Sequence, residues 1–379
     1  MKVVVSGYAA GFPVAGLFWH AASFALGFRA AGHDVWYLED SGDHPWGWDV
    51  DAGDFDHECR HGARFLAREM DAVGMGDRWV YRHAPTDRFD GMDRATTMDV
   101  LADAEVLVNV SLSLTMRPEY RRVPHRFAID TDPVFTQIRV QSSYKHFAQV
   151  PETHTRLFTF GRPPLPAQRD EWVPCRQPVP RGEWPVLPPP DAAAPFTTVA
   201  SWQAYPPSRW QEVRYGVKDV TLRTFAHLPA AAPAPMAIAL SGVHGAREGV
   251  ELLAAGGWQL PDPADATRST AAYRAFIAGS LGEIGFAKHG YVAARSGWFS
   301  ERSCSYLAAG RPVVAQDTGW SDWLPTGDGL FAFNDDAGAV AAMEEIVADP
   351  ARHAAAARKV AEEHFDGAKV CTALLEAGL

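Results

Sequence analysis

The sequence predicts an α/β protein with two Rossmann-like domains, each built on a doubly wound parallel sheet, that face a central cleft. Three observations predict this fold class. Short β-branched runs alternate with helical stretches, the alternation resumes in the second half of the chain, and a proline-rich segment separates the two series. The length of 379 residues also fits two domains, since a domain typically has about 150 residues.

Composition and charge narrow the function classes. Charged residues make up 21% and hydrophobic residues 47% of the chain, which excludes a disordered or fibrous protein. With 35 basic and 46 acidic residues the net charge is −11, so we expect neither nucleic acid nor an anionic membrane as a partner. The four cysteines lack CxxC spacing, so no zinc or redox motif is predicted.

The first half opens with a βαβ unit. Residues 3–5 are a β-branched run typical of a strand buried on both faces of a parallel sheet. A glycine-containing loop follows at 6–15, then a helix at 16–31 that ends at Gly32, and a second strand at 33–38. Further predicted elements of this half are strands at 106–110 and 127–130 and a helix at 57–73.

The stretch from Val3 to Phe28 contains no charged residue. A signal peptide or a membrane span has a similar length. Gly7, Gly11 and Pro13 interrupt the stretch, which favours a buried strand, a loop and a buried helix instead. We therefore expect no integral membrane segment and a cytoplasmic location.

Prolines are dense between residues 162 and 195, and no helix or central strand tolerates that density. This segment therefore connects the two domains. We assign residues 1–180 to an N-terminal domain, 181–195 to a linker and 196–366 to a C-terminal domain, which leaves a last helix at 367–379.

After the linker the alternation resumes. Strands are predicted at 196–200, 236–240, 258–260, 284–287, 312–315 and 329–333. Helices are predicted at 245–255, 270–280, 301–309, 336–347 and 350–363. This order predicts a second doubly wound parallel sheet.

The loop after the first strand is the first candidate site. Gly7, Gly11 and Gly16 allow the backbone to approach a ligand at a helix N-terminus, where free N–H groups favour anions. The same glycines also suit a tight turn with close packing. The spacing is not GxGxxG, so a nicotinamide dinucleotide is not favoured. His20, about one turn into the helix, is a candidate general base or a buried structural histidine.

Two carboxylates, Asp130 and Asp132, follow the strand that ends near Ile129. Residues just past the carboxyl end of a parallel strand lie where open sheets bind ligands. Paired carboxylates there can accept a proton or bind hydroxyl groups. The alternative is an Asx turn or a helix cap before Pro133.

The segment 288–303 combines positive charge with hydroxyl groups. Its cations and hydroxyl side chains are Lys288, Arg295, Arg302, Ser296, Ser300 and Ser303. They lie between a predicted strand and the start of a predicted helix, in a protein of negative net charge. This combination favours a diphosphate site over a solvated basic loop with an N-cap serine, because the cations flank a glycine turn and apolar residues.

Asp317 and Thr318 follow the next predicted strand and are placed to meet polar groups of a ligand. Around them, residues 309–319 read A-G-R-P-V-V-A-Q-D-T-G. This segment resembles the donor site of the GT-B glycosyltransferases. The opening strand and loop, together with G-H-D-V at 32–35, resemble the start of the acceptor domain in that superfamily, and 288–303 resembles a bacterial branch of it.

The resemblance implies transfer of a sugar from a nucleotide diphosphate, such as UDP, to a small-molecule or glycan acceptor, with no metal and no other cofactor. It also implies that the last helix packs back onto the first domain. A nucleotide-sugar epimerase or hydrolase of the same fold, and a nucleotide-sugar-binding protein without activity, are the alternatives.

The same resemblance implies roles for the candidate residues. The donor would be bound by Lys288, Arg295, Ser296, Glu301, Arg302, Ser303, Asp317, Thr318 and Gly319. Gly7, Gly11 and Gly16 would belong to the acceptor loop, and the catalytic candidates are Asp132, His20 and Asp130.

Several positions depart from the pattern of the superfamily. An acid that binds the nucleotide ribose would fall on Ser305, and a second acid of the retaining families would fall on Gly297. Glu301 lies one turn before Ser305 on the same helical face and can substitute for the missing acid. The histidine base of inverting families would fall near Leu17, one turn before His20. The general base, the stereochemical outcome, the sugar, the acceptor and the oligomeric state therefore stay open.

Overall fold

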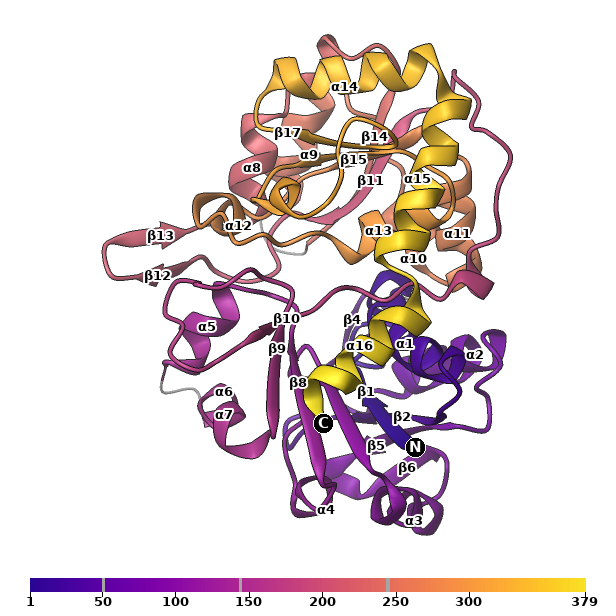
Figure 1. Ribbon diagram of the computed structural model, residues 1–379, viewed down its shortest axis with the longest axis vertical. Helices are drawn as coiled ribbons and strands as arrows, with labels where there is room; N and C mark the ends of the chain where they lie inside the picture. The colour runs from indigo at the N-terminus through magenta and orange to yellow at the C-terminus, as the bar shows by residue number, and fades with distance from the viewer. Residues whose placement is uncertain (50–51, 143–144, 243–245) are drawn as a thin grey trace.

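The computed structural model describes residues 1–49, 52–142, 145–242 and 246–379. Two α/β units lie one above the other, and the chain crosses between them after β10 (Val173–Pro174) and before β11 (Phe196–Ser201) (Figure 1). The first unit contains an eight-stranded sheet and the second a five-stranded sheet. The predicted fold class, two doubly wound parallel sheets, is confirmed.

The central strands of the first sheet are buried on both faces. Every residue of β7 (Val106–Val110) is buried, as are the last four residues of β1 (Lys2–Ser6), which agrees with their β-branched composition. The strand order is β10-β9-β8-β7-β1-β2-β5-β6, and the pairs are parallel except β5 with β6. The remaining strands are β2 (Asp34–Asp40), β5 (Trp79–His83), β6 (Arg88–Gly91), β8 (His125–Asp130) and β9 (Arg156–Thr159).

Helix α1 (Ala15–Ala30) is buried over most of its surface, because it lies between the first sheet and α16 (Gly367–Gly378). The uncharged stretch 3–28 therefore consists of β1, the loop and most of α1. No helix of the described residues is both long and apolar enough to cross a membrane. The other helices of this unit are α2 (Arg60–Ala72), α3 (Arg94–Asp103), α4 (Pro118–Arg121), α5 (Phe135–Val140), α6 (Lys145–Ala148) and α7 (Val150–Thr153).

The second sheet has the order β14-β11-β15-β16-β17, and all of its pairs are parallel. Its other strands are β14 (Met236–Ser241), β15 (Gly282–Gly285), β16 (Val313–Gln316) and β17 (Leu330–Phe333). Its helices are α8 (Lys218–Thr224), α9 (Ala246–Ala255), α10 (Pro263–Thr267), α11 (Thr270–Ala278), α12 (His289–Ala293), α13 (Glu301–Ala308), α14 (Asp336–Ala348) and α15 (Pro350–His364). Single 3-10 turns occur at Ala84–Thr86, Arg181–Glu183, Leu228–Ala230 and Trp320–Asp322.

The strand predicted at 258–260 is wrong. Gln259 alone bridges to the edge strand β14, where its N–H donates to Met236 and its carbonyl accepts from Ile238. Pro261 and Pro263 follow at once and cannot donate further ladder bonds, so the pairing stops after one residue. The first residue of the helix predicted at 245–255 lies outside the described residues.

Two short hairpins extend from the sheets. The pair β3 (Gly47–Asp49) and β4 (Asp54–Asp56) packs on α2, and the pair β12 (Ser208–Trp210) and β13 (Val213–Tyr215) reaches from the second unit to α5 of the first (Figure 1). The second hairpin therefore contributes contacts between the units.

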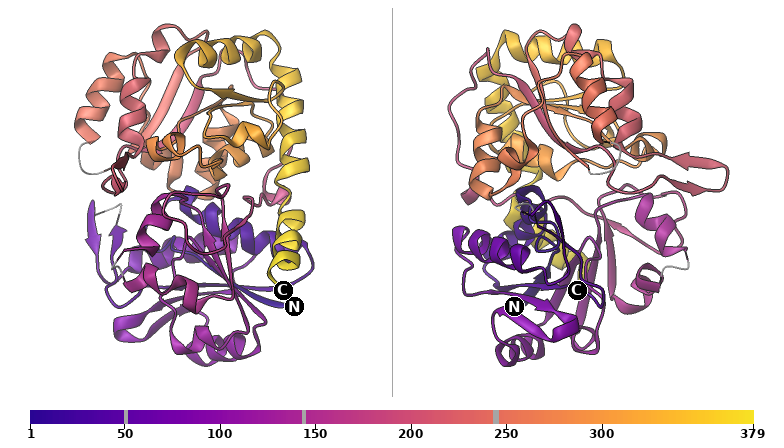
Figure 2. Two further views of the ribbon diagram at one scale, coloured as in Figure 1. Left: turned by 60° about the vertical axis from the view of Figure 1, so that its left-hand side comes forward. Right: turned by 180° about the vertical axis from the view of Figure 1, so that it is seen from behind.

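The C-terminal segment crosses back to the first unit. Helix α15 belongs to the second unit, and α16 continues from it along α1, so that both chain termini lie at the first sheet (Figure 2). Gly27 makes this close packing possible, because a Cβ atom there would lie 2.6 Å from Cys371 Sγ and 2.8 Å from the carbonyl oxygen of Gly367.

Candidate functional site

A cavity lies between the two units, beside segments that follow the carboxyl ends of β1 and β15. Helix α1 contributes Gly16 and His20 to its wall, and α13 contributes Glu301, Arg302 and Ser305. The volume is about 30 Å³, which is room for about one or two water molecules. The two units are therefore closed on each other in this structure.

A smaller cavity of about 10 Å³ lies within the second unit, at the carboxyl ends of β15 and β16. Its wall includes Trp298, Ser300, Ser303 and Trp320, and Arg302 borders both cavities. The start of α13 is thus the element that the two cavities share.

The glycine loop after β1 binds a carboxylate of the chain itself. The N–H groups of Ala9 and Ala10 donate to Glu39 at 2.7 and 2.8 Å, and the Tyr37 hydroxyl donates to it at 2.6 Å. Burial raises the pKa of Glu39 from 4.5 to about 7. These two amides of the predicted ligand loop therefore already have a hydrogen-bond partner within the chain.

The three loop glycines have different surroundings. A Cβ atom on Gly7 would lie 2.0 Å from the Tyr37 hydroxyl, so this position requires glycine. On Gly11 the nearest atoms would be at 3.6 Å, and on Gly16 nothing lies within 4 Å. Gly16 borders the cavity between the units, whereas Gly7 is required for packing.

His20 is held at the wall of the larger cavity. Its Nε2 atom lies 2.9 Å from Ser111 Oγ, which lies 2.7 Å from Thr131 Oγ1. Ser111 has a φ of 57°, in the left-handed region that non-glycine residues seldom adopt. Burial lowers the pKa of His20, and the charge of Glu301 acts in the opposite direction. A neutral imidazole at this position can accept a proton.

Asp132 and Lys288 form an ion pair between the two units. Lys288 Nζ lies 2.7 Å from Asp132 Oδ1, and the hydroxyls of Tyr205 and Tyr291 donate to the same carboxylate. The ammonium group also lies over the rings of Phe135, Tyr205 and Tyr291. Burial would raise the pKa of Asp132, but Lys288 and the two hydroxyls hold it below its usual value. In this closed state neither charge of the pair is free.

Asp130 lies behind Asp132 and borders neither cavity. Its carboxylate accepts hydrogen bonds from Asp132 N at 2.9 Å, Thr159 Oγ1 at 2.9 Å and Gln137 Nε2 at 3.1 Å. Burial raises the pKa of Asp130 to about 6. Its contacts shape the turn that presents Asp132.

Arg302 connects α13 to the sheet of the second unit. Its Nε atom donates to the fully buried Glu283 on β15, and its Nη1 atom donates to the carbonyl oxygen of Val199 at 2.6 Å. Ser300 caps the helix by accepting a hydrogen bond from Arg302 N at 3.2 Å. Ser303 is buried beside the smaller cavity.

The structure places Arg295 away from both cavities. It is exposed, and its Nη2 atom lies 3.1 Å from Asp322 on the surface. Ser296 is buried, and its carbonyl oxygen accepts a hydrogen bond from Arg162 N across the two units at 2.7 Å. Neither residue borders the cavities described above.

Asp317, Thr318 and Gly319 form a turn whose polar groups are used locally. Asp317 Oδ1 accepts from Gly319 N at 2.8 Å, and Oδ2 accepts from the Ser321 hydroxyl at 2.8 Å. The Thr318 hydroxyl donates to the carbonyl oxygen of Trp298 at 2.5 Å. This turn therefore fixes the loop that carries Trp298 into the wall of the smaller cavity.

Sequence reasoning missed Lys218, the first residue of α8. Its pKa is lowered to about 7 by burial, and the neighbouring charge of Arg302 acts in the same direction. The charge of Lys288 also lowers the pKa of Lys218, and Arg302 lies in the first turn of α13. The sequence did contain an indication of this residue. A lysine in the first turn of a helix is unfavourable next to the positive end of the helix dipole, which suggests that Lys218 is there for its function.

The chain was compared with known proteins. No protein-family model matches it, and no curated protein matches its sequence. Solved structures match its fold over the full length. AviGT4, a glycosyltransferase involved in avilamycin A biosynthesis, has a TM-score of 0.53 at 12% identity, covering 100% of this chain and 96% of that one. HepE from Anabaena, in complex with UDP and glucose, has a TM-score of 0.55 at 11% identity, covering 100% and 99%. An α-glucosyltransferase in complex with UDP and a 13-mer DNA has a TM-score of 0.58 at 9% identity, covering 99% and 97%.

The chain has the GT-B fold. In this GT-B protein the acceptor-loop candidates and His20 lie on the first unit, and the donor candidates lie on the second. The candidates that meet at the larger cavity are Gly16, His20, Glu301 and Arg302. The candidates that the structure places elsewhere are Gly7, Gly11, Asp130, Asp132, Lys288, Arg295, Ser296, Ser303, Asp317, Thr318 and Gly319.

Proposed function

We propose that this GT-B chain is a glycosyltransferase that moves a sugar from a nucleotide diphosphate to an acceptor bound in the first unit. The observation that carries the proposal is the cavity between the units, where His20 of α1 faces Glu301 and Arg302 of α13. A base on one unit and cations on the other suit a transfer across a cleft. The three similar structures are of glycosyltransferases, and two of them hold UDP.

The donor diphosphate would bind at the start of α13. Lys218 and Arg302, with the first amide groups of the helix, would stabilise the negative charge of the departing diphosphate. Lys288 would join them after it leaves Asp132. Glu301 would bind hydroxyl groups of the donor. No metal and no other cofactor is part of the proposal.

The acceptor would be a small molecule or a glycan, since the net charge of −11 disfavours nucleic acid. His20 would take the proton of the acceptor hydroxyl, because it is neutral and its orientation is fixed by Ser111. We also propose a cytoplasmic location, because none of the four cysteines, all of which lie in described residues, is paired in a disulfide.

Binding and release assays test this function together. Calorimetry with UDP and with dTDP measures donor binding, and sugar release from UDP-glucose is followed with and without a panel of acceptors. Transfer to an acceptor supports the proposal. Fast and complete turnover without any acceptor would indicate a hydrolase or an epimerase, and tight binding without turnover would indicate a binding protein.

Two lysine variants test the donor site. Lys218→Ala should weaken UDP binding by about 1–3 kcal/mol, because it removes a charged partner of the diphosphate. Lys288→Ala should weaken UDP binding by less, because it also breaks the ion pair with Asp132 that joins the units. Arg295→Ala is the matched control, since this cation of the same segment lies on the surface. Arg302→Ala is unsuitable because it leaves the buried Glu283 without its counter-ion. Equal UDP affinity in both lysine variants and the wild type would contradict the site.

A further inference from the structure

Two arginines lie at the junction of the units without an acidic partner. Arg162 and Arg176 belong to the first unit, and both guanidinium groups lie over the indole of Trp323 from the second unit, at 4.7 and 5.0 Å. Within the residues that the structure describes, no carboxylate forms an ion pair with either arginine, and none contributes to their pKa shifts. Burial lowers the pKa of both, and for Arg176 the charge of Arg162 adds to the effect.

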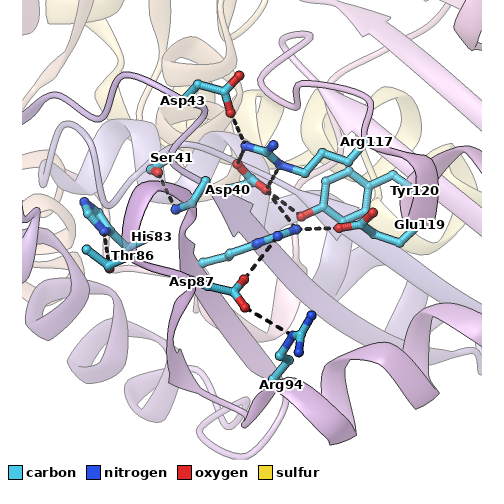
Figure 3. Close-up of polar contacts among 12 residues, drawn as sticks. Asp40, Ser41, Asp43, His83, Thr86, Asp87, Arg94, Arg117, Glu119 and Tyr120 are labelled. Atoms are coloured by element: carbon cyan, nitrogen blue, oxygen red, sulfur yellow. Dashed lines mark hydrogen bonds and ion pairs between the residues drawn. The ribbon is translucent and has the colours of Figure 1, made fainter.

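Other arginines of the first unit show the usual arrangement. Figure 3 shows Arg117 between the carboxylates of Asp40 and Asp43, with Arg117 Nε 2.8 Å from Asp40 Oδ2. Arg82 likewise has Glu119 as a partner, with Arg82 Nη1 2.5 Å from Glu119 Oε1. The chain has 46 acidic and only 35 basic residues, so carboxylates are in excess. Two half-buried arginines that repel each other and lack a counter-ion therefore leave room for an anion that is not part of the chain.

The surroundings hold Arg162 in this position. Its backbone N–H donates to the carbonyl oxygen of Ser296 at 2.7 Å. A Cβ atom on Gly297 would lie 2.5 Å from Arg162 Cγ, so residue 297 has to be glycine for the arginine to lie here. The indole of Trp323 is fixed in turn, because its Nε1 atom donates to the carbonyl oxygen of Gly297 at 3.1 Å.

Donor groups remain available on this pair. Arg176 Nη1 lies 3.0 Å from His364 Nδ1. The guanidinium group of Arg162 makes no hydrogen bond to any side chain or backbone group among the described residues. The next two residues of the chain, Gln177 and Pro178, line the cavity between the units.

We propose that Arg162, Arg176 and Trp323 form a binding site for an oxyanion, a phosphate or a carboxylate group, at the junction of the two units. Planar guanidinium groups match both kinds of oxyanion, and stacking on the indole orients them before the anion arrives. The anion is a group of the donor sugar or of the acceptor, and this part of the inference rests on the proposed function.

Titration with inorganic phosphate tests the site directly. Calorimetry at constant ionic strength compares the wild type with Arg162→Gln and Arg176→Gln, first without UDP and then with saturating UDP, which fills the proposed diphosphate site. Arg209→Gln removes a charge from the exposed strand β12 and is the matched control. We expect phosphate to bind at least tenfold more weakly to the first two variants and equally well to the control.

Equal phosphate affinity in all four proteins, or no phosphate binding to the wild type, would overturn the site. Arg162→Lys keeps the positive charge but lacks the planar guanidinium group. Its affinity for phosphate should therefore lie between that of the wild type and that of Arg162→Gln. Circular dichroism shows whether each variant is folded. If Arg162→Gln does not fold, Arg176→Gln still tests the site.

Paired ligands identify the source of the anion. UDP-glucuronic acid is compared with UDP-glucose, and glucose 6-phosphate is compared with glucose on the protein saturated with UDP. We expect one anionic ligand to bind at least tenfold more tightly than its neutral partner, and Arg162→Gln to remove this preference. If neither anionic ligand is preferred, a substrate group is not the anion. Failure of the proposed function would be seen separately, as no binding of UDP, while the phosphate titration without UDP still reports on the arginines.

Discussion

At the scale of single residues, the candidate site consists largely of charges that already have partners. Asp132 neutralises Lys288, Glu283 neutralises Arg302, and the amides of the glycine loop bind Glu39. A ligand that enters between the units has to exchange with some of these partners. The pairs therefore decide which groups are available to a donor in the closed state and which become available only after opening.

Glu39 makes a pH dependence testable. Its pKa is raised by burial from 4.5 to about 7, so its protonated form is favoured in the folded state. The resulting stability is present below pH 4.5 and is lost as the pH rises through about 7, by about 3 kcal/mol for the whole shift. Glu39→Gln carries no charge, so its free energy of unfolding should lack this fall between pH 5 and pH 8.

Urea unfolding of both proteins at several pH values checks this prediction. Glu251→Gln, on the exposed face of α9, is the control and should follow the wild type. If the free energy of unfolding changed with pH in the same way in the wild type and in Glu39→Gln, Glu39 would be ionised in the folded protein.

Sequence reasoning found residues at strand ends but not the contacts between the units. Asp130 and Asp132 lie at the end of a strand of the first sheet, and the pattern of strands was sufficient to mark them. The pairing of Asp132 with Lys288 depends on how two separately folded sheets face each other, which no local pattern encodes. Tyr205 and Tyr291 were missed for the same reason, since they meet Asp132 only across this junction.

At the scale of elements, several buried elements were predicted close to their observed positions, whereas β5, α3 and the three-residue hairpin strands were not predicted. The strand at 106–110 and the helix starts at Thr270 and Pro350 were predicted at the positions observed. Hairpin strands of three residues, such as β3 and β12, are too short to show an alternating pattern. The hairpins are held by contacts with α2 and α5, which are tertiary.

The packing of α1 on α16 gives a prediction at this scale. Gly27→Ala should destabilise the protein by about 1–3 kcal/mol, because the new methyl group would overlap Cys371 and the backbone of Gly367. In an open helix position the same change would stabilise the helix by up to about 1 kcal/mol. Gly16→Ala is the matched control within α1, since nothing lies within 4 Å of its Cβ position.

Thermal unfolding of the two alanine variants shows whether each substitution stabilises or destabilises the protein. We expect a lower midpoint for Gly27→Ala and an unchanged or slightly higher midpoint for Gly16→Ala. A gain in both variants would mean that α16 does not pack tightly on α1.

At the scale of the whole molecule, the two units are in contact along a junction that several elements form. The cavity between them that His20 and Glu301 line has a volume of about 30 Å³, far below the several hundred Å³ of ligand pockets. Helix α16 and the hairpin β12–β13 join the units (Figure 2). The ion pair Asp132–Lys288 joins them as well. Under the proposed function, a nucleotide sugar enters this cavity only after part of the junction opens, so the free energy of opening is subtracted from the affinity for that ligand.

The pair Asp132–Lys288 is the contact whose removal should have the clearest effect on this equilibrium. Asp132→Asn removes the carboxylate that holds Lys288, so the units should separate more easily and Lys288 should become available to the diphosphate. We expect UDP affinity to rise by roughly threefold to tenfold. A larger fraction of the variant would already be in the open state that binds UDP, so less free energy would be spent on opening. Small-angle scattering of the unliganded variant should show a larger radius of gyration than the wild type.

A double variant separates the two causes of this gain. Asp132→Asn with Lys288→Ala still opens the junction but lacks the released cation, so its UDP affinity should fall below that of Asp132→Asn alone. Glu251→Gln breaks the exposed ion pair with Arg247 inside the second unit and should change neither scattering nor affinity. A loss of UDP affinity in Asp132→Asn would show instead that the pair stabilises the binding-competent arrangement, because the closed structure would then be the one that the donor selects.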